Sequence, residues 1–327
     1  AGAWPGPACY GAGGPLTLTD VNLALGRLDP HRFEIPLDAE ASERVVATLL
    51  ARIAEREGSA PPREAILAGL LEIADERMAE AIRDISLRRG YDPADYALVA
   101  FGGAGGQHAC AVAELLGIAR IVVPRDAGLL SALGLGAAVV ERFGERQVLQ
   151  PLAAVRNRLP DWLGELAGEA LAAVAAEGAS SEEATVRRRL LHLRFAGQEE
   201  SLTVEPRDGE SPEEAFAKAY REIYGYAPEG REIELESIRV VASSVPEPLP
   251  LEDGPEEPRA AVPTGTRRTW AGGRWVEAPV FDRAGLSPGD AFAGPALVFE
   301  SHSATMIGEG WRGRLDGAAN LVLTAAD

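Results

Sequence analysis

Residues 96–123 of this chain, YALVAFGGAGGQHACAVAELLGIARIVV, carry the pattern that decides the fold. Tyr96–Phe101 is a short apolar run of strand length, and Gly102–Gln107 is so rich in glycine that it predicts a turn. His108–Leu116 then predicts a helix, and Ile118–Val123 predicts a second buried strand. A strand, a glycine turn, a helix and a strand in this order form a βαβ unit, so the sequence predicts a parallel sheet.

The pattern of predicted helices and strands changes near residue 150. Residues 1–150 predict an α/β domain, and residues 151–327 alternate β patterns with turns, which predicts a β-rich α+β domain. In the first domain we expect a long helix whose apolar face comprises Ile66, Leu70, Ile73, Ala74, Met78, Ile82 and Ile85. In the second we expect helices at Trp162–Ala176 and Pro212–Tyr224 and strands at Val186–Phe195, Ser201–Glu205 and Ile233–Ala242. Residues 246–263 contain six prolines and several acids, which is typical of a solvated loop or linker.

The charge and the cysteine content exclude several classes of protein. The formal net charge is −18, and a surface of that sign repels nucleic-acid phosphates and anionic lipids, so we expect neither partner. The longest uncharged stretch, Ala127–Val140, is too short to span a bilayer. The two cysteines, Cys9 and Cys110, form no disulfide framework, so a reducing compartment, the cytoplasm, is the expected location.

The glycine turn is the first candidate site. Its glycines leave backbone N–H groups uncovered at the start of a helix, where the helix dipole favours negative charge, so the turn can hold a nucleotide. A tight turn that binds nothing fits the spacing equally well. A dinucleotide fingerprint is a poor match, because His108 stands where GxGxxG requires its last glycine.

His108 and Asp20 are the other candidates. His108 follows the turn and can contact a phosphate, or it can form only local hydrogen bonds. Asp20 follows a glycine-rich loop at the start of a short helix, where a carboxylate can bind Mg²⁺ or orient a water, or can only cap its helix. The four histidines never occur as H-x-H or H-x-x-x-H, so we expect no metal site of that kind.

Several motifs together resemble one family. They are PGPACYG at residues 5–11, LTLTDVN at residues 16–22, FGGAGGQHA at residues 101–109, the small-residue stretch at residues 127–135, RFAGQ at residues 194–198, YGY at residues 224–226 and GPA at residues 294–296. They look like the family's PGPACYG…TxTDAN stretch, its FGGAGPLHA motif, its GVLSAxGL helix and parts of its C-terminal domain. On these motifs the chain is identified as a member of the hydantoinase A / 5-oxoprolinase family, which includes the β-type subunits of acetone and acetophenone carboxylases.

The resemblance implies a fold and a site. Residues 1–150 would be half of an actin-like ATPase fold, related to sugar kinases and Hsp70, and residues 151–327 the family's β-rich C-terminal domain. The residues expected to contact ATP, on its adenosine side, are Gly102, Gly103, Ala104, Gly105, Gly106 and His108, and the candidate catalytic residue is Asp20. Family members use ATP and Mg²⁺ to open a cyclic amide, by phosphorylating its carbonyl oxygen, or to activate a ketone for carboxylation.

The chain departs from the family's pattern in two ways. Gly106 and Gln107 replace the usual Pro-Leu, and the family's DxGGTxTD phosphate loop is absent. We therefore expect this piece to lack contacts to the γ-phosphate and Mg²⁺ and to be inactive alone. Its expected partners are the family's N-terminal lobe, a hydantoinase B-type subunit and a small cyclic amide. The alternatives are a subunit of an ATP-dependent ketone carboxylase and a non-catalytic assembly module.

Overall fold

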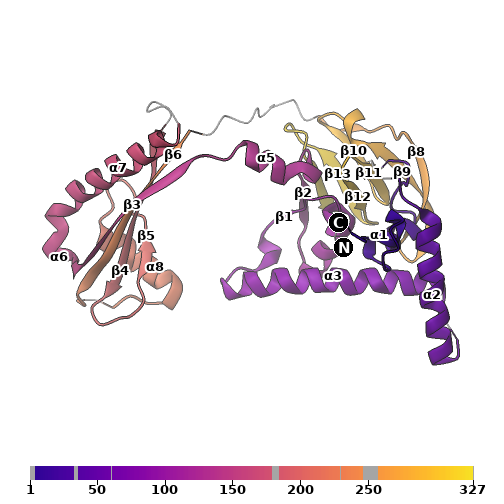
Figure 1. Cartoon of the computed structure of the whole chain (residues 1–327), viewed down its shortest axis with the longest axis horizontal. Coiled ribbons are helices and arrows are strands. Elements are labelled where there is room, and N and C mark those ends of the chain that lie inside the picture. Colours follow the sequence, from indigo (N-terminus) through magenta and orange to yellow (C-terminus); the bar gives the residue numbers. More distant parts are fainter. Residues whose placement is uncertain are drawn as a thin grey trace. The chain divides into compact units, whose positions relative to one another are not determined.

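The computed structural model describes residues 4–32, 36–59, 61–178, 184–228, 230–245 and 257–326. These residues form a mixed α/β architecture in which the strands make three sheets. The chain divides into two compact units, one made of residues 1–133 and 250–327 and the other of residues 134–249. Figure 1 labels most of the helices and strands of both units.

The first unit combines helices from the N-terminal part of the chain with strands from both parts. Its helices are α1 (Leu18–Ala24), α2 (Ala39–Glu57), α3 (Arg63–Arg88) and α4 (Gly105–Leu116), with 3₁₀ turns η1 (Ala8–Tyr10), η2 (Pro93–Asp95), η3 (Ala127–Leu129) and η5 (Arg283–Gly285). Its strands are β1 (Leu98–Val99), β2 (Arg120–Val123), β7 (Arg259–Ala260), β8 (Gly265–Ala271), β9 (Arg274–Asp282), β10 (Asp290–Ala293), β11 (Ala296–Phe299), β12 (Ala304–Ile307), β13 (Trp311–Leu315) and β14 (Leu321–Ala325). Helix α5 (Leu130–Gly136) spans the boundary between the units.

The predicted βαβ unit is confirmed. β1 and β2 pair in parallel, with Leu98 opposite Ile121, and α4 connects them. They form one side of a six-stranded sheet of order β1-β2-β14-β13-β10-β7, and a second sheet has the order β12-β11-β9-β8. The apolar face of α4, which includes Ala109 and Ala113, packs in one core with Ile121 of β2 and Ile307 of β12. Packing against β2 of the first sheet and β12 of the second sheet thus fixes the position of α4.

The compact units divide the chain at residues 134 and 250, and the domain boundary that we expect near residue 150 stays a prediction. The last strand, β14, pairs antiparallel with β2, with Leu321 opposite Val123, so the C-terminal segment completes the sheet of the first unit. Residues 134–150 belong instead to the second unit, where β3 pairs with β6. The alternation of apolar residues identifies strands, but it does not tell which sheet each one joins.

Two local expectations are also corrected. Helix α4 begins at Gly105, three residues earlier than predicted, so Gly105–Gln107 form its first turn rather than a loop. The fully buried residues of α3 are Leu67, Leu71, Asp75 and Ala79. Of the predicted face, Leu70, Met78 and Ile82 pack against core clusters, whereas Ile73 and Ile85 are exposed. The buried stripe is thus shifted to one side of the predicted stripe, and packing against neighbouring elements decides the shift.

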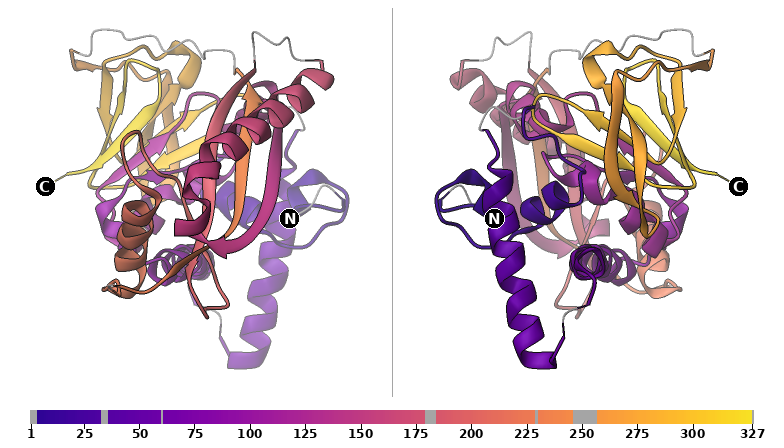
Figure 2. Two further views of the ribbon diagram at one scale, coloured as in Figure 1. Left: turned by 90° about the vertical axis from the view of Figure 1, so that its left-hand side faces the viewer. Right: turned by 90° about the vertical axis from the view of Figure 1, so that its right-hand side faces the viewer.

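The second unit is a four-stranded antiparallel sheet of order β3-β6-β4-β5, on which α7 and α8 pack (Figure 2). Its elements are β3 (Glu141–Pro151), α6 (Leu152–Val155), η4 (Arg156–Arg158), α7 (Leu159–Ala176), β4 (Ala184–Phe195), β5 (Leu202–Val204), α8 (Pro212–Tyr224) and β6 (Ile233–Ser244). Ser211 caps α8 by accepting the N–H of Glu214, and Gly225, with a φ of +79°, ends the helix. The helices and strands expected in this region are present, with ends shifted by a few residues.

Residues 246–256 of the proline-rich stretch lie outside the described residues. Among the described helices, none combines the length and the apolar character needed to cross a bilayer.

Candidate functional site

The start of α4 presents free backbone N–H groups. The chain turns after β1 at Gly102, whose φ of +84° lies in the left-handed region that glycine adopts without strain. Gly102 donates its N–H to the carbonyl oxygen of Ala127 over 2.8 Å, which ties the turn to the segment after β2. The N-cap residue Ala104 forms no side-chain cap, and the N–H groups of Gly105 and Gly106 have no partner among the described residues. Together with the helix dipole they favour a negatively charged ligand atom.

The glycines of this turn serve different purposes. A Cβ atom on Gly106 would lie 2.3 Å from Oγ1 of Thr305, so this glycine lets α4 approach β12 closely. A Cβ on Gly103 would lie 3.0 Å from the carbonyl oxygen of His302. Gly105, in contrast, has room for a Cβ, whose nearest neighbour would be 3.7 Å away. Close packing therefore explains Gly106 without any ligand.

A pocket of about 690 Å³ lies between the start of α4 and the start of α1. It is lined by Tyr10, Thr17, Leu18, Thr19, Asn22, Leu28, Leu37, Gly103, Ala104, Gln107, His108, Ser301 and His302. We call it the α1–α4 pocket. Of the residues expected to bind ATP, it includes Gly103, Ala104 and His108. Gly102, Gly105 and Gly106 belong to the same turn but do not line the pocket, and neither does Asp20.

Three buried polar side chains form part of the pocket wall. Asn22 is 3 % exposed, Gln107 5 % and His108 7 %. Gln107 donates from Nε2 to the carbonyl oxygen of Ala304 over 3.1 Å, but its Oε1 atom has no hydrogen-bond partner among the described residues. The Oδ1 atom of Asn22 is likewise buried without a partner. Buried polar atoms are nearly always paired in proteins, so two orphaned oxygens on one pocket wall indicate a ligand or an ordered water.

The His108 ring is held by a carboxylate. Its Nδ1 atom lies 2.6 Å from Oδ1 of Asp75, and both side chains are buried. Because a carboxylate only accepts, Nδ1 carries the proton, and Nε2 of the neutral ring is then an acceptor. Burial lowers the pKa of the nearby Arg27 guanidinium, while the negative charge of Asp75 opposes that shift.

Asp75 was not among the residues singled out from the sequence. It recurs at intervals of four residues with Leu67, Leu71 and Ala79 on the buried face of α3. An acid at a position of the apolar face is a signal that sequence reasoning can use, because a carboxylate is rarely buried without a partner. The signal was missed because only apolar residues were assigned to the buried face of α3.

Asp20 lies at the centre of a hydrogen-bond network. It is fully buried, and its carboxylate accepts five hydrogen bonds: from the N–H groups of Ala8, Cys9 and Thr17 and from the hydroxyls of Thr17 and Ser42. With Thr17 it forms the capping box of α1. Burial raises the pKa of Asp20, but the hydrogen bonds outweigh burial and hold the pKa below its usual value. This geometry favours the capping interpretation, and a catalytic role for Asp20 stays a prediction.

Asp20 is a poor ligand for Mg²⁺ in this structure, because its carboxylate already accepts from five donors. The described residues contain no group of three or more His, Cys, Asp or Glu side chains able to hold a metal. Binding of Mg²⁺ by Asp20 stays a prediction that the geometry does not favour.

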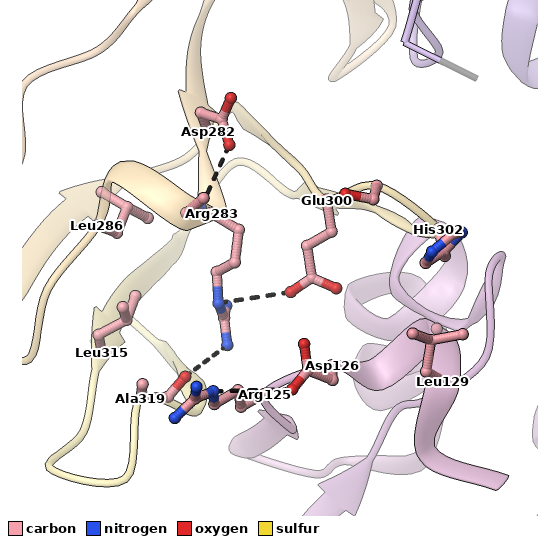
Figure 3. A pocket seen from close by; sticks show the side chains of 13 residues that line it. Arg125, Asp126, Leu129, Asp282, Arg283, Leu286, Glu300, His302, Leu315 and Ala319 are labelled. Carbon is pink, nitrogen blue, oxygen red and sulfur yellow. Dashed lines mark hydrogen bonds and ion pairs between the residues drawn. The ribbon is translucent and has the colours of Figure 1, made fainter. Parts of the chain in front are cut away.

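A second pocket, of about 450 Å³, lies on the other side of the β11–β12 turn and shares Ser301 and His302 with the first. Arg283 points into its wall, with Nε 3.4 Å from Oε1 of Glu300 and Nη2 donating to the carbonyl oxygen of Ala319 (Figure 3). Burial lowers the pKa of Arg283, and Glu300, Asp316 and Asp126 oppose that shift. The lining holds two guanidinium groups, of Arg125 and Arg283, against three carboxylates, of Asp126, Asp282 and Glu300, and this excess of negative charge disfavours an anionic ligand. The α1–α4 pocket is therefore the better candidate for a nucleotide.

The two thiols are predicted to be unreactive in the folded chain. Cys9 and Cys110 are free and buried, and burial raises the pKa of each to about 12, with the charge of Asp20 adding to the shift at Cys9. Since the thiolate is the reactive form, a disulfide reagent at pH 8 should label neither thiol in the native chain and both in guanidinium chloride. The folded chain keeps both thiols protonated up to a higher pH than the unfolded chain does. The free energy of unfolding should therefore be unaffected by these thiols below pH 9 and should fall as the pH rises from 9 towards 12. Native labelling at the rate of a free cysteine would contradict the prediction.

Comparisons with known proteins cover nearly the whole chain. A family model described as Hydantoinase/oxoprolinase matches residues 1–142, and one described as Hydantoinase/oxoprolinase C-terminal domain matches residues 150–325. A 5-oxoprolinase of Pestalotiopsis fici is 31 % identical over 94 % of this chain and 25 % of its own length. The caprolactamase subunit alpha of Pseudomonas jessenii is 29 % identical over 99 % of this chain and 48 % of its own length.

Two solved structures share the fold. The crystal structure of the ATP-dependent caprolactamase from Pseudomonas jessenii aligns with a TM-score of 0.78 and 27 % identity over 100 % of this chain and 49 % of that chain. A nucleotide-free acetone carboxylase aligns with a TM-score of 0.76 over 97 % of this chain and 48 % of that chain, and its 24 % identity shows the fold alone. The chain thus spans between a quarter and a half of the length of the relatives named here.

Proposed function

Because this chain belongs to the hydantoinase/oxoprolinase family, we propose that it is the C-terminal portion of an ATP-dependent enzyme that opens a cyclic amide. The observation that carries the proposal is the match of two family models to consecutive parts of the chain, which together span almost all of it. The relatives named 5-oxoprolinase and caprolactamase support a lactam as the substrate class. Ketone carboxylation remains the alternative.

We propose that the first unit is half of an actin-like ATPase fold and that the α1–α4 pocket takes the adenosine side of ATP. Gly103, Ala104 and His108 line this pocket, and the free N–H groups of Gly105 and Gly106 lie at the same helix start. The orphaned oxygens of Asn22 and Gln107 offer acceptors to a ligand. When bound, ATP supplies the phosphoryl group that makes the carbonyl oxygen of the amide a leaving group.

In this proposal the residues of the chain bind and orient rather than react. The helix start attracts negative charge, Asp75 fixes the ring of His108, and the leucines of the pocket exclude water from one side of the ligand. We further propose that catalysis needs the N-terminal lobe and a hydantoinase B-type subunit, that this chain alone is inactive, and that the complex works in the cytoplasm.

Reconstitution tests the proposed function. The chain is mixed with the N-terminal lobe and the B-type subunit, and phosphate release from ATP is measured with 5-oxoproline, hydantoin or ε-caprolactam. We expect lactam-dependent release from the full mixture and none from the chain alone. An arm with acetone and bicarbonate tests the carboxylase alternative. Silence with every cyclic amide would count against lactam opening, and activity of the chain alone would contradict the need for partners.

A further inference from the structure

The side-chain amide of Gln107 has a fixed orientation. Its Nε2 atom lies 3.1 Å from the carbonyl oxygen of Ala304, and a carbonyl oxygen can only accept a hydrogen bond. Turning the amide over would place two acceptors against each other, so the nitrogen must face Ala304. The Oε1 atom therefore points away from β12, and no described residue donates to it.

This oxygen is buried, and the residue that carries it lines a pocket. Gln107 is 5 % exposed and lines the α1–α4 pocket, so bulk water does not satisfy Oε1 freely. Asn22, 3 % exposed, lines the same pocket with a second orphaned oxygen. A buried acceptor left without a donor is costly, and the cost is recovered when a ligand supplies the donor. The pocket wall is thus complementary to a molecule that carries N–H groups.

The rest of the lining narrows the class of ligand. Leu28 and Leu37 are buried in the same wall, and Leu18 adds a half-exposed apolar surface. The Nε2 atom of His108 is a further acceptor when the ring is neutral, since Asp75 holds the proton on Nδ1. Apolar surface beside several acceptors suits a small ring with an N–H group at its edge.

Gln107 is also one of the two positions at which this chain departs from the FGGAGPLHA motif that it resembles, and the motif has leucine there. A leucine offers no acceptor. The orphaned oxygen is therefore a property of this chain and is not explained by the shared motif.

We propose that Oε1 of Gln107 accepts a hydrogen bond from an N–H group of the molecule bound in the α1–α4 pocket and so determines which ligand the pocket takes. The inference rests on the proposed function in that it requires a small-molecule site here. The donor is an N–H on the edge of a ring, and two ligands of the proposed reaction carry one: the exocyclic amine of adenine and the ring amide of a lactam.

Matched ligand pairs identify the donor. Calorimetry on the chain compares ADP with the diphosphate of purine riboside, which lacks the amine, and ε-caprolactam with ε-caprolactone, in which oxygen replaces N–H. We expect one pair to differ by about tenfold in affinity, and this pair names the source of the N–H. In Gln107→Leu the ratio of the two affinities within this pair should fall to near one, chiefly because the N–H ligand binds more weakly.

Control variants distinguish the loss of this hydrogen bond from a loss of folding. Leucine occurs at this position in the family's motif, so Gln107→Leu is expected to fold, and Gln107→Met provides a second variant of similar length. Gln147→Leu, at an exposed position of β3 in the other unit, should leave both affinity ratios unchanged. Thermal unfolding of each variant is measured beside the calorimetry.

The outcomes are distinct from those of the reconstitution. Equal binding within both pairs by the wild-type chain, or an unchanged ratio in Gln107→Leu, would mean that a water satisfies Oε1, and the inference would be overturned even if the mixture hydrolyses lactams. Discrimination by Gln107 without any lactam hydrolysis would uphold the inference and reject the proposed function. If the chain shows no heat, the same pairs are titrated into the reconstituted complex, and no heat there rejects the inference.

Discussion

Replacing Asp20 by alanine is expected to lower the free energy of unfolding of the first unit by about 3 to 5 kcal/mol, because it leaves buried donors without their charged acceptor. The carboxylate accepts from Ala8 and Cys9 in η1, from Thr17 at the cap of α1 and from Ser42 in α2. No other group in this network can take over these bonds. Denaturant unfolding followed by tryptophan fluorescence measures the change, since Trp270, Trp275 and Trp311 belong to the same unit.

A matched control is Asp38→Ala. Asp38 also caps a helix, accepting the N–H of Ala41 over 2.9 Å, but its side chain is 44 % exposed. We expect this change to cost about 1 kcal/mol, the usual value of an exposed N-cap. Equal effects of the two substitutions would show that the network around Asp20 adds nothing to a simple cap.

The pH dependence gives a second measure of Asp20. Its pKa is lower in the folded chain than in the unfolded chain, so its stabilising effect is complete above the unfolded pKa and is lost as the pH falls through the folded pKa. Asp20→Asn should therefore weaken the loss of stability in acid. A fully stable Asp20→Asn protein that has lost turnover in the reconstituted complex would instead support the catalytic role.

Gly106→Ala is expected to destabilise the first unit by about 1 to 3 kcal/mol through overpacking. The added methyl group would lie 2.3 Å from Oγ1 and 2.9 Å from Cβ of Thr305, which is itself buried. Helix α4 would have to move away from β12, and this movement would also disturb the bond between Gln107 and Ala304. Thermal unfolding and ligand titration of the variant measure both consequences.

The neighbouring Gly105 provides the control. It occupies the first position of the same helix, and a Cβ there would meet its nearest neighbour at an ordinary 3.7 Å. Because alanine is the better helix former, Gly105→Ala should leave stability unchanged or raise it by up to about 1 kcal/mol. A loss of stability as large as that of Gly106→Ala would show that flexibility of the turn matters, rather than the contact with Thr305.

The sequence predicted elements well where local signals agree. β1, α4 and β2 follow from two apolar runs around a glycine turn, and α8 begins at the Ser211 capping box and ends at Gly225. It placed the stripe of α3 correctly only in part, since Ile73 and Ile85 are exposed. It also missed the first turn of α4, because Gly105 and Gly106 have low helix propensity and the N-cap, Ala104, is not one of the usual capping residues.

The candidate site also combines residues that a local motif reveals with residues that only tertiary packing brings together. Gly103, Ala104 and His108 were singled out because they stand in one recognisable motif, and all three line the α1–α4 pocket, although their role in binding stays a prediction. Asp75 is 33 residues from His108 in sequence, and Asn22 comes from another helix. Their relation to the motif depends on how α1, α3 and α4 pack, which no local pattern contains.

The sequence by itself determined the family, the βαβ unit with its glycine turn, and the acidic charge that disfavours nucleic-acid partners. Tertiary structure decided that the last strands return to the first unit's sheet, that Asp20 binds five donors, and that Gln107 and Asn22 place unpaired oxygens on one pocket wall. The physical reason is range: propensities, caps and hydrophobic periods act within a few residues, whereas strand pairing and the satisfaction of buried polar atoms join residues from distant parts of the chain.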